Sequence, residues 1–247
     1  DISFKTTGFG SVKLGNTGYR FIKIEAVECD ISLKTVQGIF VHKNIEYRGS
    51  FKCNDEEINK IWQVGAYTVF LNMQDYLWDG IKRDRLVWMG DMHPETLTIL
   101  SVFGYDSVIP KSLDLVMNST PPGEWMNTFP TYTSWWVINQ KDLFMHSGDF
   151  KYLLDRKEYL FNVLNQILGC VSDGGELDYP DYFCDWSSRN TDDEIVGAYA
   201  VTVMGLKSGK VLCDYLGNAE LSKKCEESTK RLLSKKLIMH QNKQTAA

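Results

Sequence analysis

The sequence predicts a mainly α-helical fold, in which part of an (α/α)6 toroid follows strands from a β-sandwich domain. The apolar residues change from a period of two to a helical period near residue 50. Beyond that point, long and short connections alternate between the predicted helices. We therefore divide the 247 residues into the C-terminal strands of a sandwich domain, 1–48, and the N-terminal half of a toroid, 49–247.

The first region contains short segments with strand character. Tyr19–Glu25 alternates apolar and polar residues, Ile31–Leu33 repeats the pattern, and Thr35–Val41 is rich in residues favoured in strands. Three or four strands cannot bury both faces of a sheet by themselves. We therefore expect these segments to complete a larger β-sandwich.

The second region begins with Asn54–Glu57, which has the pattern of a capping box. Ile58, Ile61, Trp62 and Val69 then follow at helical spacing. Later helix starts carry an aspartate or asparagine just after a glycine that ends the preceding helix. The predicted helices are 54–73, 92–103, 106–118, 133–147, 149–167, 192–216 and 218–236.

The connections predict the topology. Three are long, namely 74–91, 119–132 and 168–191, and the others span only a few residues. Antiparallel neighbours need only short turns, so all the long loops should emerge at the same end. This pattern is typical of an α/α toroid with one functional rim, and an ordinary bundle with decorated loops is the alternative. Because a closed toroid uses about six hairpins, we interpret the chain as a fragment that holds its first half.

Composition excludes several classes of function. The net charge is −5 and no Lys/Arg-rich run is present, so nucleic acid is not expected as a partner. No stretch approaches the roughly 18 apolar residues of a membrane span, and no membrane partner is expected. We also expect no cofactor. The start of the chain carries no leader pattern, and the compartment stays open, with a periplasmic or extracellular location favoured over the cytoplasm.

The cysteines and histidines predict no metal site. The six cysteines form no CxxC pair, so zinc-ligand spacing is missing. Free buried thiols are the expected state, with a disulfide between Cys170 and Cys184 as the alternative. His93 follows Asp91 closely, but one histidine and one aspartate do not make a metal site.

The first long loop holds the densest group of reactive side chains. Asp79, Asp84 and Asp91 are spaced by five and seven residues, with arginines and a tryptophan between them. Glycoside hydrolysis needs a proton donor and carboxylates that stabilise an oxocarbenium-like charge. When carboxylates lie close together, their repulsion raises the pKa of one of them. That carboxyl group can then stay protonated and act as an acid. A solvated cluster of ion pairs is the alternative on residue types alone.

This loop resembles the signature of the α-L-rhamnosidases of glycoside hydrolase family 78, which is Asp-Cys-Pro-x-Arg-Glu/Asp-(Glu)-Arg-x-x-Trp-x-Gly-Asp. Gly80–Ile81 replaces the usual Cys-Pro, and Asp84 stands where many members carry glutamate. Gly49–Trp62 is similar to the family's junction between sandwich and toroid. The positions that match the signature are Asp79, Arg83, Arg85, Trp88, Gly90 and Asp91.

The resemblance implies an inverting hydrolase that releases L-rhamnose from a glycan or glycoside. Asp84 would be the general acid, and Asp79 and Asp91 would bind sugar hydroxyls and tune its pKa. The general base would be a glutamate further along the family's toroid, and no residue of this chain matches that motif. We therefore assign no base and expect this chain alone to be inactive.

Aromatic side chains extend the predicted sugar site. Seven Trp, twelve Tyr and twelve Phe make up 13% of the chain, and many lie in loops, where their flat faces suit sugar rings. Asp185–Trp186 resembles a sugar-contacting pair of the family. One residue of Trp135–Trp136 should lie in the core and the other at the rim, and we assign Trp136 to the site. The predicted substrate-binding residues are Asp79, Arg83, Trp88, Asp91, Trp136, Asp185 and Trp186.

Two other functions stay open. A toroid-type polysaccharide lyase would need a tyrosine, histidine or lysine base near an arginine or metal, and no single loop groups such residues. A non-catalytic glycan-binding module would keep the aromatic loops but would not need three aspartates.

Overall fold

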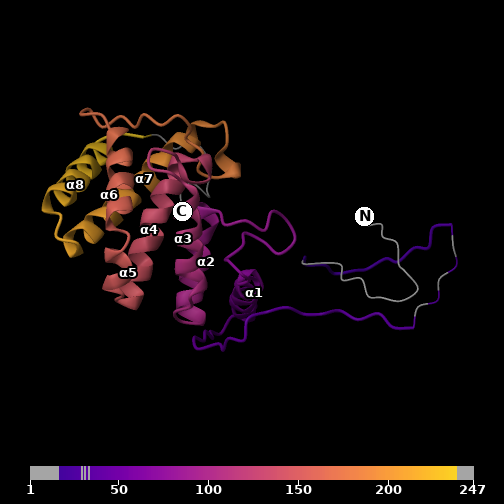
Figure 1. Ribbon diagram of the computed structural model, residues 1–247. Helices are drawn as coiled ribbons and strands as arrows, with labels where there is room; N and C mark the ends of the chain where they lie inside the picture. Colours follow the sequence, from indigo (N-terminus) through magenta and orange to yellow (C-terminus); the bar gives the residue numbers. More distant parts are fainter. Residues whose placement is uncertain (1–16, 29, 31, 33, 238–247) are drawn as a thin grey trace.

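The computed structural model describes residues 17–28, 30, 32 and 34–237. Figure 1 shows a helical body from which residues 34–50 extend to one side. Two 3-10 turns, η1 (Met126–Thr128) and η2 (Trp186–Ser188), lie in loops. The α-helices of the described residues are α1 (Glu56–Asn72), α2 (Met89–Val102), α3 (Val108–Ser119), α4 (Pro130–Ser147), α5 (Phe150–Leu154), α6 (Lys157–Gly169), α7 (Asp192–Tyr215) and α8 (Ala219–Leu233).

The helices form an inner row and an outer row. Helix α4 packs between α2 and α7, and these three make up the inner row. Helices α1, α3, α6 and α8 form the outer row, and the chain passes from outer to inner through each long loop. The inner helices therefore all begin at the end of the body that carries the long loops.

The long loops lie together, as the alternation of connections predicts. Asn127 of the second loop donates to the carbonyl of Val87 in the first loop, at 3.1 Å, and accepts from the N–H of Met89, at 3.0 Å. Thr131, in the first turn of α4, donates to the carbonyl of Phe183 in the third loop. These bonds link the three loops across the starts of the inner helices.

Several predicted helix boundaries need correction, including those of α4, which begins at Pro130 rather than at 133, and of α8, which ends at Leu233 rather than at 236. The predicted helix 149–167 is interrupted at Asp155–Arg156, which separates α5 from α6. The Arg156 guanidinium binds both carboxylate oxygens of Asp114 on α3, and its Nη1 donates to the carbonyl of Tyr152. The break between α5 and α6 therefore coincides with a contact between Arg156 and α3, a helix distant in the sequence. Helix α2 begins three residues earlier than predicted, at Met89, whose N–H is capped by Asn127.

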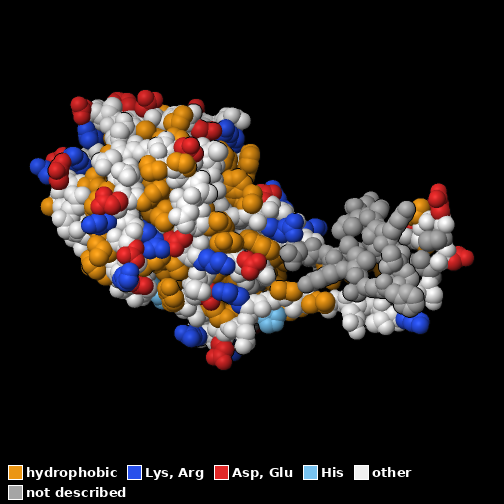
Figure 2. Space-filling view, in the orientation of Figure 1, with side chains coloured by type: hydrophobic (Ala, Val, Ile, Leu, Met, Phe, Trp, Pro, Cys, Tyr) orange, Lys and Arg blue, Asp and Glu red, His pale blue; other side chains and the backbone are white. Residues whose placement is uncertain are grey.

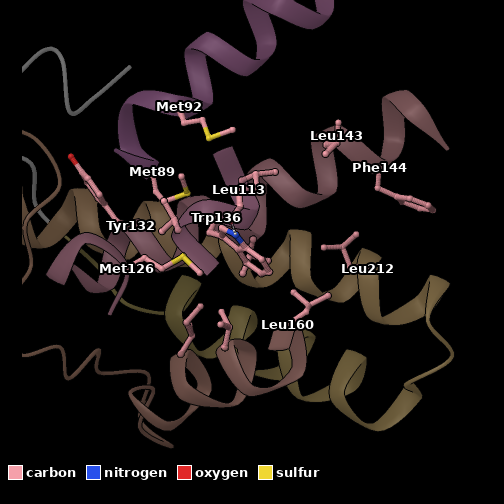
Figure 3. Packing of buried hydrophobic residues seen from close by; sticks show 14 of the residues in the cluster. Met89, Met92, Leu113, Met126, Tyr132, Trp136, Leu143, Phe144, Leu160 and Leu212 are labelled. Carbon is pink, nitrogen blue, oxygen red and sulfur yellow. Dashed lines mark hydrogen bonds between the residues drawn. The ribbon is translucent and has the colours of Figure 1, made fainter. Parts of the chain in front are cut away.

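The core lies between the two rows of helices. Trp136 is fully buried at its centre, and its indole N–H donates to the carbonyl of Leu113 at 3.2 Å. Figure 3 shows Trp136 beside Leu113, whereas Tyr132 lies at the edge of the cluster with its hydroxyl directed away from Trp136. Methionines 89, 92 and 126 are buried in the same cluster. The core thus supports the end of α4 that carries the loops.

Contrary to the expectation that no stretch approaches a membrane span, helix α7 is long and apolar enough to cross a membrane by length and composition alone. It contacts α4 and α8, and about half of its apolar window is buried inside the body. Its first turn carries Asp192, Asp193 and Glu194, which suit the positive end of a helix dipole. In this structure α7 therefore behaves as a core helix.

The described residues between 17 and 48 form no β-strand. A strand requires a ladder of backbone hydrogen bonds to a neighbouring strand, and the described part of this segment makes only isolated ones, such as Gly18 N–H to the carbonyl of Ile81 and Arg48 N–H to the carbonyl of Val102. The segment projects from the body in Figure 2, and Phe21 and Ile39 are exposed. The predicted strands at 19–25 and 35–41 are therefore not formed here, and Ile31 and Leu33 lie outside the described residues. The assignment of 1–48 to a sandwich domain stays a prediction.

Candidate active site

Asp79 closes the first long loop through hydrogen bonds with Leu86. The N–H of Asp79 donates to the carbonyl of Leu86, and the N–H of Leu86 donates to Oδ1 of Asp79, both at 3.0 Å. Arg85 adopts a left-handed φ of 55°, which reverses the chain at this point. The tip presents Arg83 and Asp84 to solvent. Asp79 therefore shapes the loop as well as contributing charge.

Asp91 lies where α2 begins, in the first turn. A negative charge at this position is favoured by the helix dipole. Gly90 precedes it, and a Cβ at position 90 would stand 2.8 Å from a ring carbon of Tyr132. Glycine is thus required for α2 to approach α4 closely enough to bring Asp91 beside Tyr132.

The predicted aspartates converge. The pKa of Asp91 is raised, chiefly by burial of its carboxyl and then by the charges of Asp79, Asp185 and Asp84, against a backbone hydrogen bond that lowers it. Asp185 comes from the third long loop, so the cluster joins carboxylates from two loops and one helix. Although Asp91 is exposed as a whole residue, its carboxyl lies deep enough for burial to be the main cause of its raised pKa.

A buried glutamate beneath the cluster escaped the sequence prediction. Glu95 lies one helical turn after Asp91 and is 8% exposed. Burial raises its pKa to about 8, with smaller contributions from Asp91 and Asp79, although a hydrogen bond from Asn72 Nδ2 to Oε1 at 2.9 Å opposes the shift. The four-residue spacing from Asp91 was the available signal, because it puts both acids on one face of the helix.

Tyr132 forms the aromatic wall of the site and was also missed. Its pKa is strongly raised by burial and then by the charges of Asp91 and Asp185, which places its hydroxyl near both carboxylates. Its ring meets Trp88 edge to face at a centroid distance of 6.2 Å and also packs against Phe129 at 5.2 Å. A protonated phenol is thus available to donate a hydrogen bond within the site.

Asp185 and Trp186 lie on the third long loop. Oδ1 of Asp185 accepts from the N–H of Trp186 at 2.7 Å, and Oδ2 accepts from Oγ of Ser187 at 2.8 Å. The indole of Trp186 meets Phe183 edge to face and remains 77% exposed. Such an exposed indole, beside a carboxylate of the cluster, offers an open flat surface to a ligand.

An ion-pair network braces this loop. The Arg189 guanidinium binds Asp181 at 2.6 and 3.1 Å and Glu194 at 2.7 Å. The pKa of Asp181 is lowered by its hydrogen bond from Arg189. Because Glu194 lies in the first turn of α7, the network ties the tip around Trp186 to an inner helix.

The structure corrects one predicted site residue and explains its neighbour. Trp136 is completely buried in the core, so we withdraw it from the sugar site. Trp135 is partly buried and stacks on His93 at a centroid distance of 4.7 Å. His93 pairs with Asp142 at 3.3 Å, and no metal-binding group of three ligands occurs among the described residues.

The cysteines of the described residues are free thiols, and Cys170 and Cys184 form no disulfide. A shallow groove of about 290 Å³ lies between α1 and α2, away from the acidic cluster. Its lining includes Trp62, Leu97 and Val102 and carries no ionisable side chain. The groove is therefore not the candidate site.

Comparison with known proteins gives a family match over most of the chain. The model of the bacterial alpha-L-rhamnosidase 6 hairpin glycosidase domain matches residues 46–245. An alpha-L-rhamnosidase of Formosa agariphila is 28% identical over 81 residues, which are 33% of this chain and 8% of that protein.

Solved structures share the fold. The rhamnosidase of Klebsiella oxytoca with rhamnose bound has a TM-score of 0.67 at 19% identity, over 77% of this chain and 40% of that one. The family 78 rhamnosidase of Bacillus sp. GL1 has a TM-score of 0.65 at 21% identity, over 78% and 22%. The α-L-rhamnosidase of Dictyoglumus thermophilum has a TM-score of 0.61 at 19% identity, over 78% and 24%. These likenesses confirm the toroid prediction, and the chain spans less than half the length of each structure.

Proposed function

Because this chain belongs to the bacterial α-L-rhamnosidase six-hairpin glycosidase family, we propose that the protein carrying it hydrolyses terminal α-linked L-rhamnose from glycans or glycosides. The observation that carries the proposal is the convergence of Asp79, Asp84, Asp91 and Asp185 at the loop-bearing end. Glycoside hydrolysis needs carboxyl groups in both the protonated and the ionised state. A cluster in which the pKa of Asp91 is raised by burial and then by neighbouring charges supports this difference.

In this proposal Asp84 is the general acid. It stands at the acid position of the family signature, at the exposed tip of the first loop, where a substrate oxygen can approach it. Asp79 and Asp91 bind sugar hydroxyls. An Asp91 that keeps its proton can itself donate a hydrogen bond to a hydroxyl.

The remaining residues bind the sugar ring. Arg83, exposed beside Asp84, can donate two hydrogen bonds to hydroxyls. Trp186, with Asp185 next to it, gives a flat apolar face for sugar C–H groups. Trp88 packs edge to face against Tyr132 and extends this aromatic surface.

We further propose an inverting mechanism whose general base lies outside this chain. An inverting enzyme holds its acid and its base about 6.5–9.5 Å apart, with a water between the base and the anomeric carbon. The described acids that surround Asp84 are assigned to binding, so none of them is assigned as the base. The chain on its own is therefore expected to bind sugar without turnover.

The test is an assay of the complete protein on an aryl α-L-rhamnoside beside the aryl glycosides of other sugars. We expect turnover of the rhamnoside, with inversion visible as first-formed β-L-rhamnose by NMR. Asp84→Asn should lower kcat by about 100-fold or more, and Asp84→Glu should retain more activity. A preference for another sugar, or retention of configuration, would contradict the proposal.

The same variants distinguish the other functions. A non-catalytic glycan-binding module would show no turnover, and its affinity for rhamnose would be unchanged by Asp84→Asn. A polysaccharide lyase would release an unsaturated uronide with ultraviolet absorbance from a uronic-acid polymer.

A further inference from the structure

The acidic cluster lies directly above a buried acid that the proposed reaction does not use. Glu95 is 8% exposed, so it cannot contact a substrate held at the loop tips. We propose that Glu95 is a positioning residue, which holds Asp91 and the loop of Asp79 in their working arrangement through α2 and through its hydrogen bond with Asn72. The inference rests on the proposed function of the site above it.

The link to Asp91 is direct. The two acids are four residues apart on α2 and therefore lie on the same face, one turn from each other. The charge of Asp91 acts on the carboxyl of Glu95. The carboxyl groups of Glu95 and Asp91 therefore lie within electrostatic reach of each other along α2.

The link to Asp79 runs through the end of α1. Asn72, itself 6% exposed, donates from Nδ2 to Oε1 of Glu95 at 2.9 Å. The backbone carbonyl of Asn72 accepts from the N–H of Gln74 at 2.9 Å and of Trp78 at 3.1 Å. Trp78 immediately precedes Asp79, so the Glu95–Asn72 bond holds the base of the loop that Asp79 closes.

The protonation state of Glu95 matters to this arrangement. The charged groups that act on it are Asp91 on its own helix and Asp79 on the loop after α1, and both are negative. From α4, on the other side of α2, Tyr132 faces Asp91, and the Lys141–Asp142 pair engages His93. With a pKa of about 8, Glu95 is protonated at neutral pH and adds a negative charge under the cluster only in alkaline solution.

Glu95→Gln is the decisive variant, measured in the complete protein on an aryl α-L-rhamnoside between pH 5 and pH 10. Glutamine preserves the acceptor for Asn72 and stays neutral. Its kcat/KM should lie within about threefold of wild type near pH 6, and the ratio of variant to wild type should rise as the pH passes through about 8. Glu95→Ala should lose about 10- to 100-fold at every pH, because the cluster is displaced.

Glu158 supplies the matched control, since its side chain is 81% exposed on α6. Glu158→Gln and Glu158→Ala should leave both the rate and its pH profile unchanged. A flat ratio for Glu95→Gln, or wild-type activity in a folded Glu95→Ala, would overturn the inference. If Glu95→Ala does not fold, the pH dependence of the ratio of kcat/KM between Glu95→Gln and wild type still tests the inference.

Crystal structures separate this inference from the proposed function. Should the wild-type protein hydrolyse no rhamnoside, the proposed function fails, and the positions of Asp79 and Asp91 still test Glu95. Both carboxyl groups should move in Glu95→Ala and stay in place in Glu95→Gln. Unmoved carboxyl groups in Glu95→Ala would refute the positioning role whatever the reaction.

Discussion

The ring of Tyr132 lies against Gly90, and no side chain larger than hydrogen fits between them. This contact brings the first turn of α2, with Asp91, against the first turn of α4. The carboxyl of Asp91 is thereby close enough for its charge to raise the pKa of the Tyr132 phenol, after the larger effect of burial.

Gly90→Ala should therefore damage the site. The added methyl would meet the ring at 2.8 Å, which forces α2 and α4 apart. We expect a loss of about 1–3 kcal/mol in the free energy of unfolding, measured with urea, together with a fall in kcat/KM. Gly65→Ala on α1 is the control, because nothing lies within 4 Å of its added methyl. That variant should gain about 0.5–1 kcal/mol. Equal effects of the two substitutions would contradict the close-packing explanation.

Trp136 and Trp186, two of the three tryptophans that the sequence assigned to sugar binding, should behave differently. Trp136→Ala removes a fully buried ring and should destabilise the protein by about 3–5 kcal/mol. Trp186→Ala removes an exposed ring, so it should leave stability nearly unchanged and weaken L-rhamnose binding by about tenfold. Thermal unfolding and calorimetric titration separate the two effects. A stable Trp136→Ala would show that the ring is not part of the core.

Arg189 should control binding through the third loop. Lysine cannot reproduce its two-pronged contact with Asp181 together with its contact with Glu194, so Arg189→Lys should loosen the tip around Trp186. We expect KM to rise by about fivefold, with a smaller change in kcat. Lys151→Ala, which removes an exposed ion pair with Asp155, should leave KM unchanged. An unaltered KM in Arg189→Lys would show that the network does not hold the tip.

The raised pKa of Glu95 predicts a pH dependence of stability. The folded protein holds this proton up to about pH 8, whereas the unfolded chain releases it near the ordinary value of 4.5. Between these values only the folded state keeps the proton, so the contribution of Glu95 to stability is complete below pH 4.5. It falls by about 1.4 kcal/mol per pH unit as the pH rises toward 8. The glutamine in Glu95→Gln does not ionise, so the variant lacks this pH-dependent contribution to stability.

The measurement is the difference in unfolding free energy between Glu95→Gln and wild type, taken at each pH so that other titrations cancel. The unfolding free energy of the variant relative to that of wild type should increase between about pH 4.5 and pH 8 and then stay constant. A difference that does not change with pH would show that Glu95 ionises with its ordinary pKa.

Local patterns predicted much of this molecule. The helical period, the caps and the glycine stops act within a few residues, so the sequence located the helices and the three long loops. Their alternation predicted that the loops meet at one end. The spacing of Asp79, Asp84 and Asp91 predicted an acidic site there, and the cluster is present.

Only the tertiary structure decided which side chains are buried and which distant groups meet. Two adjacent tryptophans look alike in the sequence, but the packing of α4 against α3 puts Trp136 in the core and leaves Trp135 beside His93. Glu95 and Tyr132 join the site because α1, α2 and α4 converge there, and burial then shifts their protonation. The sequence by itself determined the helices, the loops and the acids, because those depend on near neighbours. Burial and charge coupling depend on contacts between residues far apart in the chain, so the fold alone could set them.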